Sequence, residues 1–273
     1  MPLAGREQGL ASSFSGTVVN EALEDGVKEL RAKIEECMTV GWGEGVESGN
    51  LSTWLTEGQL TNVELLRFLL HADENVDKAW QHLLQIGEWR KVHVDNAAKR
   101  DWGSFSGADM MFWLGKDREG IPTLMMRTAE HTPGAAEAHE FEEYFTYLME
   151  QARHEVGVGK ELQINLVLDR KGVAFKNQDP GLLRKVLPLV NKAYPEILNM
   201  CFVAPSNALF TCIWKVVSKL ISTRTAGKFT LLRPAQIPEL LEKFDPAVLP
   251  THLGGSRTDY PPANGVTWGD GPT

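Results

Sequence analysis

The hydrophobic period of the chain changes near Trp102, and this change limits the folds that the sequence can adopt. Before it, apolar residues recur at the spacing of amphipathic helices. After it, short apolar runs typical of strands alternate with segments of helical period. The expected strands cover residues 110–114, 123–127, 162–168, 198–204 and 228–232. The expected helices cover residues 140–155, 182–194, 207–222 and 234–244. Strands that alternate with helices favour an α/β fold with a largely parallel sheet.

Two local features add detail to this fold. A polar turn that Gly120 and Pro122 close separates the first two strands, which are therefore expected to form a hairpin. The chain before this region carries apolar stripes at helical spacing, which cover residues 22–37, 63–70 and 76–86. Residues 41–52 are rich in Gly and Ser and predict a linker, with Ser52 as a helix N-cap. The predicted parts are a small helical N-terminal lobe over residues 1–95, an α/β domain over residues 96–256 and a disordered tail over residues 257–273.

Composition excludes several classes of protein. No apolar run approaches the ~18 residues that a membrane-spanning helix needs. The first residues lack the pattern of a secretory signal, so a cytoplasmic protein is expected. Cys37, Cys201 and Cys212 have no metal-binding or disulfide spacing and are expected to be small core residues. His71 and His252 are expected at the surface.

Motifs of common enzymes are absent from the sequence. It contains no GxSxG elbow, P-loop or GxGxxG fingerprint, which argues against common hydrolases, nucleotide-binding proteins and dehydrogenases. His131, His139 and Glu142 lack metal-ligand spacing, so no metal site is predicted. We expect a protein that is not an enzyme and needs no cofactor.

The charge of the chain is distributed unevenly. The net charge is -8, yet residues 181–243 hold nine basic and three acidic residues, which gives that segment +6 and leaves -14 for the remainder. A basic segment in an acidic protein indicates a local anionic partner. An anionic membrane surface fits better than nucleic acid, because no nucleic-acid-binding motif accompanies the charge.

An ordered set of short motifs resembles one known family. The motifs are Leu65–Leu69, Val76–Ala79, Glu88–Lys91, Gly120–Pro122, Asp169 with Gly172, Tyr194–Glu196, Ala204–Pro205, Thr225–Lys228 and Leu253–Gly255. Each is weak alone, but together and in this order they resemble CRAL-TRIO lipid-binding and lipid-transfer proteins. The resemblance implies a sheet floor under an apolar pocket, with a gate helix over it.

That resemblance also implies a function. The chain is expected to bind one phospholipid, with phosphatidylinositol favoured and phosphatidylcholine second, and to transfer or present it between membranes. It would act as a monomer that contacts anionic membranes transiently. Two alternatives stay open: a carrier of an isoprenoid or sterol-type ligand, and a lipid-sensing interaction module.

Three residues are implied as headgroup ligands by their match to phosphatidylinositol-transferring members: Glu196, Thr225 and Lys228. A lysine supplies a positive charge for a phosphodiester, while a hydroxyl and a carboxylate can bond inositol hydroxyls. The alternative is that these are ordinary surface and strand-start residues. Related proteins carry a basic turn where this chain has Leu70–Glu74 with two acids, which removes positive charge from the expected headgroup site.

The helix expected over residues 207–222 is the candidate gate. Its apolar face includes Phe210, Ile213, Val216, Val217 and Leu220, with Trp214 at the flank, while Lys215 and Lys219 lie on the polar face. A cationic face beside a broad apolar one suits a membrane interface. The alternative is an ordinary helix that faces the core. The expected gate and membrane contacts are Phe210, Ile213, Trp214, Lys215, Val217, Lys219 and Leu220.

Overall fold

The computed structural model describes residues 13–14, 17–40, 54, 60–103, 105, 107–157, 162–219 and 221–258. Their contacts divide the chain into two compact units. The first contains Met1–Lys99, Arg153–Leu162 and Val190–Ile197. The second contains Arg100–Ala152, Gln163–Leu189 and Leu198–Thr273. The predicted linker over residues 41–52, its N-cap Ser52 and the tail beyond residue 258 lie outside the described residues, and the predicted domain boundaries stay predictions.

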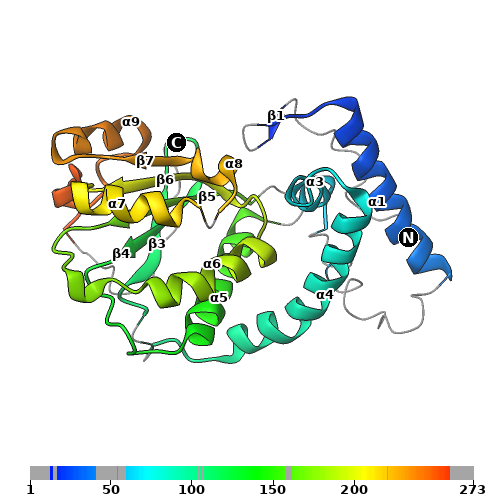
Figure 1. The fold of residues 1–273 in the computed structure, drawn as a ribbon, viewed down its shortest axis with the longest axis horizontal. Helices are drawn as coiled ribbons and strands as arrows, with labels where there is room; N and C mark the ends of the chain where they lie inside the picture. The colour runs from blue at the N-terminus through cyan, green and yellow to red at the C-terminus, as the bar shows by residue number, and fades with distance from the viewer. Residues whose placement is uncertain are drawn as a thin grey trace. The chain divides into compact units, whose positions relative to one another are not determined.

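The first unit is built mainly from α1 (Glu21–Val40), α3 (Asn62–His71) and α4 (Val76–Lys99), labelled in Figure 1. These helices confirm the three apolar stripes. Two short strands, β1 (Ser13–Phe14) and β2 (Thr17–Val18), pair antiparallel. Thr61 caps α3, because its hydroxyl oxygen accepts the N–H of Glu64 at 3.2 Å.

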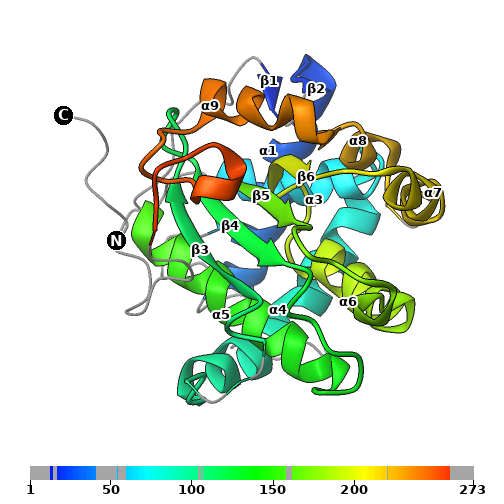
Figure 2. The same cartoon turned by 90° about the vertical axis from the view of Figure 1, so that its left-hand side faces the viewer.

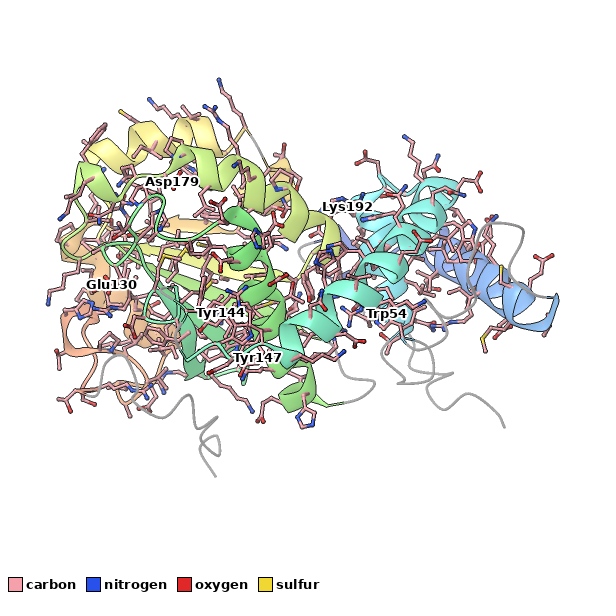
Figure 3. The ribbon with its side chains drawn as sticks, turned by 90° about the horizontal axis from the view of Figure 1, so that it is seen from below. Trp54, Glu130, Tyr144, Tyr147, Asp179 and Lys192 are labelled. Carbon is pink, nitrogen blue, oxygen red and sulfur yellow. The ribbon has the colours of Figure 1, made fainter. Side chains whose placement is uncertain are left out.

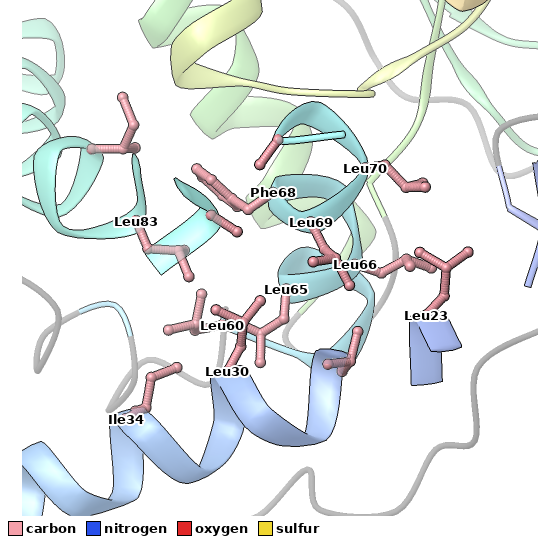
Figure 4. Close-up of a cluster of buried hydrophobic side chains, with 14 of the residues drawn as sticks. Leu23, Leu30, Ile34, Leu60, Leu65, Leu66, Phe68, Leu69, Leu70 and Leu83 are labelled. Carbon is pink, nitrogen blue, oxygen red and sulfur yellow. The ribbon is translucent and has the colours of Figure 1, made fainter. Parts of the chain in front are cut away.

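A leucine-rich core holds these helices together. Leu23, Leu30 and Ile34 lie on one side of α1, and each is at most 1% exposed. They belong to one cluster with buried side chains of α3 and α4, among them Leu65, Leu66, Phe68, Leu69 and Leu83 (Figure 4). Burying one such side chain is worth roughly 1.5–3 kcal/mol, so this cluster is a main source of stability for the unit.

His82 of α4 gives the first unit a pH-dependent stability. Its Nε2 lies 2.9 Å from the backbone oxygen of Lys192, and its ring packs against Phe68 and His71 at centroid distances of 4.9 and 5.0 Å. Burial, followed by repulsion from His71, lowers the pKa of His82 from 6.5 to about 4. Lys192 affects the pKa of His82 in two ways: the hydrogen bond to its backbone oxygen raises the pKa, and the positive charge of its side chain lowers it.

We expect the free energy of unfolding to fall as the pH drops from about 6.5 to 4. In this window the unfolded chain binds a proton at His82 that the folded chain does not, so acid favours unfolding, by about 1–2 kcal/mol once solvent screening of the half-buried ring is allowed for. Denaturant titrations at several pH values should show that the free energy of unfolding depends less steeply on pH in His82→Gln than in wild type. His154→Gln, at an exposed histidine, is the matched control. Equal slopes in wild type and His82→Gln would contradict this assignment.

The second unit contains a five-stranded sheet in the order β3-β4-β5-β6-β7, of which Figure 2 labels the first four strands. The strands are β3 (Met111–Lys116), β4 (Pro122–Arg127), β5 (Ile164–Asp169), β6 (Leu198–Ala204) and β7 (Phe229–Leu231). β3 and β4 form the predicted antiparallel hairpin, and the remaining neighbours are parallel. The predicted α/β fold with a largely parallel sheet is therefore confirmed.

A buried polar network ties the hairpin turn to the central strands. Asp117 accepts the backbone N–H groups of Glu119 and Ile121 with one carboxylate oxygen, at 2.9 and 2.8 Å. Its other oxygen accepts Nδ2 of Asn165 at 2.7 Å, and Asn165 in turn accepts Nδ2 of Asn199 at 2.9 Å. Because buried polar groups need partners, this network favours one alignment of β3–β4, β5 and β6.

Helices cover both faces of the sheet (Figure 1). On one face, Leu240 of α9 (Leu240–Lys243) and Phe244 pack near Phe202 of β6, with ring centroids of the two phenylalanines 5.6 Å apart. On the opposite face, Phe210 of α7 (Ala208–Val217) packs with Cys201 and Val203. The remaining helical elements are α5 (Ala138–Val156), α6 (Pro180–Ala193), α8 (Thr223–Ala226), η1 (Phe175–Asn177), η2 (Pro234–Glu239) and η3 (Thr251–Leu253).

Three expectations need correction. The helix predicted over residues 207–222 ends at Val217, and α8 follows as a separate turn. The helix predicted over residues 234–244 is divided into the 3-10 helix η2 and α9, because Pro238 has no N–H to donate to an α-helical bond. Cys212 is exposed and not a core residue, since it lies two positions from the buried Phe210 on α7 and so on the other side of the helix.

Among the described residues, no helix combines the length and the apolar character that crossing a bilayer requires.

Candidate functional site

Eight apolar side chains form one continuous face of the sheet, which we call the apolar sheet face. The strand register aligns Leu124, Leu166, Cys201 and Phe229 in one row, and Met126, Leu168, Val203 and Leu231 in the next. Directly paired residues point to the same side of a sheet, so the two rows lie on the same face. Two rows of apolar residues across four strands can accept only an apolar neighbour.

The chain covers this face at its two sides. Towards β3, the indole N–H of Trp113 donates to the backbone oxygen of Leu148 in α5 at 3.2 Å. Tyr144, also in α5, donates its hydroxyl to Met111 at 2.9 Å and lies beside Tyr147 (Figure 3). Towards β7, the ring of Trp214 in α7 packs on Phe229 with centroids 4.2 Å apart.

Between α5 and α7, where Figure 2 shows α6, the coverage is incomplete. Leu166 and Leu168 of β5, the central strand, and Met126 of β4 stay partly exposed. The inner strands of a largely parallel sheet are normally covered on both faces, so partly exposed leucines there are unusual. An apolar surface of this kind, inside the fold and not fully used by it, is typical of a binding site for an apolar ligand.

The predicted gate residues differ in exposure and in the element to which they belong. Phe210 is buried, and Ile213, Trp214 and Val217 are half-buried on α7. Lys215 is exposed on the helix, and Lys219 is exposed in the turn after it. Val216 is 61% exposed, so the expectation that it lies on the apolar face is wrong. Leu220 lies outside the described residues.

Local hydrogen bonds explain where the gate helix begins and ends. Asn207 caps α7, because its side-chain oxygen accepts the N–H of Phe210 at 2.9 Å. The hydroxyl of Ser222 accepts the N–H of Thr225 at 3.1 Å and so starts α8. Serine side chains that bond their own backbone compete with helix continuation, which accounts for the shorter helix. The packing of α7 on the sheet fits both a closed gate and an ordinary core helix, so gating stays a prediction.

The predicted headgroup residues belong to different units of the chain. Lys228 is only 8% exposed, and its ammonium donates to the backbone oxygen of Leu198 at 2.6 Å. Thr225 lies in α8, where its hydroxyl oxygen is 2.9 Å from that of Ser222. Glu196 belongs to the first unit and has a left-handed φ of 53°. Its grouping with Thr225 and Lys228 stays a prediction.

The acidic turn also belongs to the first unit. Asp73 and Glu74 are exposed after α3 and have φ angles of 51° and 63°. The N–H of Glu74 donates to the backbone oxygen of Leu69 at 2.9 Å, which closes the end of the helix. The turn therefore has a structural role, and its effect on a ligand stays a prediction.

Sequence reasoning missed a polar cluster at the carboxyl end of β5. Asp169 is 4% exposed, and its carboxylate accepts the N–H of Lys171 at 2.9 Å and lies 2.8 Å from Nε2 of His252. The expectation that His252 is a surface residue is wrong, because this contact holds it half-buried. The neighbouring Arg170 is buried as well. Asp169 was noted only as part of a motif, and no spacing connects it with His252.

The second unit thus defines an α/β protein in which one apolar sheet face is only partly covered by helices. The family model for the CRAL/TRIO domain matches residues 108–255, and the chain belongs to the CRAL/TRIO domain family. The resemblance seen in the sequence motifs is confirmed.

Two curated relatives from Arabidopsis thaliana are similar over most of this chain. Patellin-4 is 30% identical over 209 residues, which cover 72% of this chain and 38% of Patellin-4. Phosphatidylinositol/phosphatidylcholine transfer protein SFH13 is 25% identical over 212 residues, which cover 70% of this chain and 34% of SFH13. The chain therefore spans little more than a third of the length of these relatives.

A solved structure is similar in fold. The crystal structure of Sfh5 superposes with a TM-score of 0.66 at 15% sequence identity, covering 87% of this chain and 88% of that one. At this identity the similarity shows the fold alone.

Proposed function

We propose that this chain binds a single lipid on the apolar sheet face and transfers or presents it between membranes. The partly exposed Leu166, Leu168 and Met126 carry this proposal, because they leave apolar surface that acyl chains can cover. Membership of the CRAL/TRIO domain family and similarity to relatives named as phosphatidylinositol/phosphatidylcholine transfer proteins support it. The proposed ligand is a phospholipid, with phosphatidylinositol favoured and phosphatidylcholine second.

The energetics explain why a carrier is needed. Each methylene removed from water is worth about 0.8 kcal/mol, so a diacyl lipid cannot cross water unless a protein covers its chains. The apolar sheet face offers such cover. α7 would complete it as a gate that exchanges contacts with the sheet for contacts with the bilayer, and the basic segment over residues 181–243 would favour an anionic surface.

The predicted setting follows from this mechanism. The chain would act without catalysis, as a monomer in the cytoplasm that meets membranes peripherally. The helical lobe over residues 1–95 and the domain over residues 96–256 are the proposed domains. Mass spectrometry of organic extracts from protein purified from cells should find about one lipid per chain. Bare protein, with no uptake from vesicles, would contradict the proposed function.

Replacing Lys228 should test the proposed headgroup contact of Glu196, Thr225 and Lys228. Loss of a charge-assisted hydrogen bond costs about 1.5–3 kcal/mol, so Lys228→Ala should lower phosphatidylinositol affinity roughly tenfold or more while sparing phosphatidylcholine. Vesicle-to-vesicle transfer of each lipid measures this effect. Lys243→Ala is the control, because that lysine is 46% exposed and pairs with Glu119. Unchanged phosphatidylinositol transfer in both Lys228→Ala and Glu196→Ala would remove these residues from the site.

A carrier of an isoprenoid or sterol-type ligand is the second candidate. It is favoured by Asp73 and Glu74, two acids where phosphatidylinositol-binding relatives are expected to carry bases. Extracted lipid without phosphorus would support it. A lipid-sensing interaction module would instead bind lipid but show little transfer between vesicles.

A further inference from the structure

Arg170, which directly follows β5, has two buried guanidinium nitrogens without a hydrogen-bond acceptor among the described residues. The residue is 6% exposed, and within the described part of the chain neither Nε nor Nη2 has a partner. Its side chain lies over the ring of Phe210, with Cζ 4.3 Å from the ring centroid. Burial lowers the pKa of this guanidinium from its usual value. Buried donors without acceptors destabilise a protein, so this arrangement needs a reason.

The neighbouring carboxylate does not serve Arg170. Asp169 is occupied by the N–H of Lys171 and by Nε2 of His252, at 2.9 and 2.8 Å. The backbone of Arg170 is satisfied, because its N–H donates to Ala204 at 2.8 Å and its oxygen accepts from Val173 at 3.2 Å. In the guanidinium, Nε and Nη2 lack an acceptor among the residues that the structure describes.

The position of Arg170 is one that favours anions. It lies at the carboxyl ends of the parallel strands β5 and β6, where open α/β sheets commonly bind ligands. Phe210, the ring beneath it, is in the first turn of α7, a helix of 10 residues. A helix N-terminus carries partial positive charge, which acts here even though the N–H of Phe210 is already bonded to Asn207. Two sources of positive potential therefore meet here.

We propose that Arg170 and the first turn of α7 bind one anionic oxygen group, a phosphate or a carboxylate, of the bound lipid. The planar guanidinium can hold two oxygens of such a group at once. A lipid as the source of the anion rests on the proposed function; inorganic phosphate is the other source of the same chemistry.

This site is separate from the one predicted around Lys228. The ammonium of Lys228 donates to the backbone oxygen of Leu198, the first residue of β6. The backbone N–H of Arg170 donates to the backbone oxygen of Ala204, the last residue of β6. At about 3.3 Å per residue, these two anchors lie roughly 20 Å apart. One phosphate cannot contact both, so loss of phosphatidylinositol binding in Arg170→Leu but not in Lys228→Ala places the lipid phosphate at Arg170, and the opposite result places it at Lys228.

The test compares Arg170→Leu and Arg170→Lys with wild type. Delipidated protein is offered phosphatidylinositol, or diacylglycerol with the same chains, from detergent micelles, and retained lipid is measured. Arg170→Leu should bind phosphatidylinositol at least about tenfold more weakly and diacylglycerol equally well. Arg170→Lys keeps the positive charge but not the planar guanidinium, so its affinity for phosphatidylinositol should lie between those of wild type and Arg170→Leu. Arg233→Leu, at an exposed arginine, should match wild type.

Stability gives a second readout. Leucine fits beside Phe210 without buried donors, so bare Arg170→Leu should melt about 2–4 °C above bare wild type. Phosphatidylinositol should stabilise wild type more than the variant. Wild-type retention of phosphatidylinositol by Arg170→Leu, or equal loss of both lipids, would overturn the inference, since Arg170 would then only pack on Phe210.

Inorganic phosphate separates this inference from the proposed function. If wild type takes up neither lipid, the proposed function fails. A rise in melting temperature with phosphate that Arg170→Leu abolishes would then keep the anion site, with free phosphate as its ligand. No Arg170-dependent response to either phosphatidylinositol or phosphate would overturn the site itself.

Discussion

Replacing Leu166 by aspartate should reduce lipid retention by roughly a thousandfold, because a carboxyl group buried beside acyl chains without a partner costs about 4 kcal/mol or more. Leu166 lies in the row of the apolar sheet face that includes Cys201 and Phe229, and it is partly exposed. In the bare protein the new side chain can stay hydrated, so the fold should survive. Circular dichroism checks folding, and native mass spectrometry measures retained lipid.

Leu241→Asp is the matched control for this variant. Leu241 is also half-buried, but it packs in the cluster on the opposite face of the sheet. It should lose some stability and keep its lipid. A folded Leu166→Asp protein that retains lipid as wild type does would show that the chains do not lie on the apolar sheet face.

The second large effect concerns the exposed lysines of the gate. We expect Lys215→Glu/Lys219→Glu to slow transfer to anionic vesicles at least about a hundredfold, and to neutral vesicles much less. Each basic residue contributes about 1 kcal/mol near an anionic membrane, and the double variant replaces that attraction with repulsion. Added salt should remove most of the difference, since exposed charges are screened over about 8 Å at physiological ionic strength.

Lys78→Glu/Lys99→Glu makes the same change in net charge on α4 and serves as the control, because both lysines are exposed. A fluorescent probe on α7 should move to an apolar environment when vesicles are added. Wild-type transfer by the gate variant together with an unchanged probe would show that α7 is an ordinary core helix.

Periodicity predicted the elements whose structure depends on local pattern. The alternation through Leu166 and Leu168 places β5 correctly, and the stripe through Leu23 and Leu30 places α1. The break after Val217 was missed because it depends on the hydrogen bond that the Ser222 hydroxyl accepts from the N–H of Thr225. A sequence pattern describes the average preference of a segment, whereas capping is decided by single side chains.

The candidate site was predicted only in part, for a different physical reason. The contact of Asp169 with His252 joins residues 83 positions apart, and the burial of Arg170 depends on Phe210 of a later helix. Such contacts arise only when the sheet has formed. Lys228 shows the same limit, because a lysine expected to reach a headgroup is held at a backbone oxygen of β6.

The network of Asp117, Asn165 and Asn199 lies apart from the apolar sheet face. Asn165 alternates with Leu166 along β5, so its side chain points to the other side of the sheet. On β5, the side chain that helps to align the strands therefore points to one side of the sheet, and the side chains proposed to contact the ligand point to the other. Substitutions at Leu166 or Leu168 can change which apolar ligand fits while the polar side keeps the strands aligned, which makes this sheet a scaffold on which ligand preference can diverge without loss of the fold.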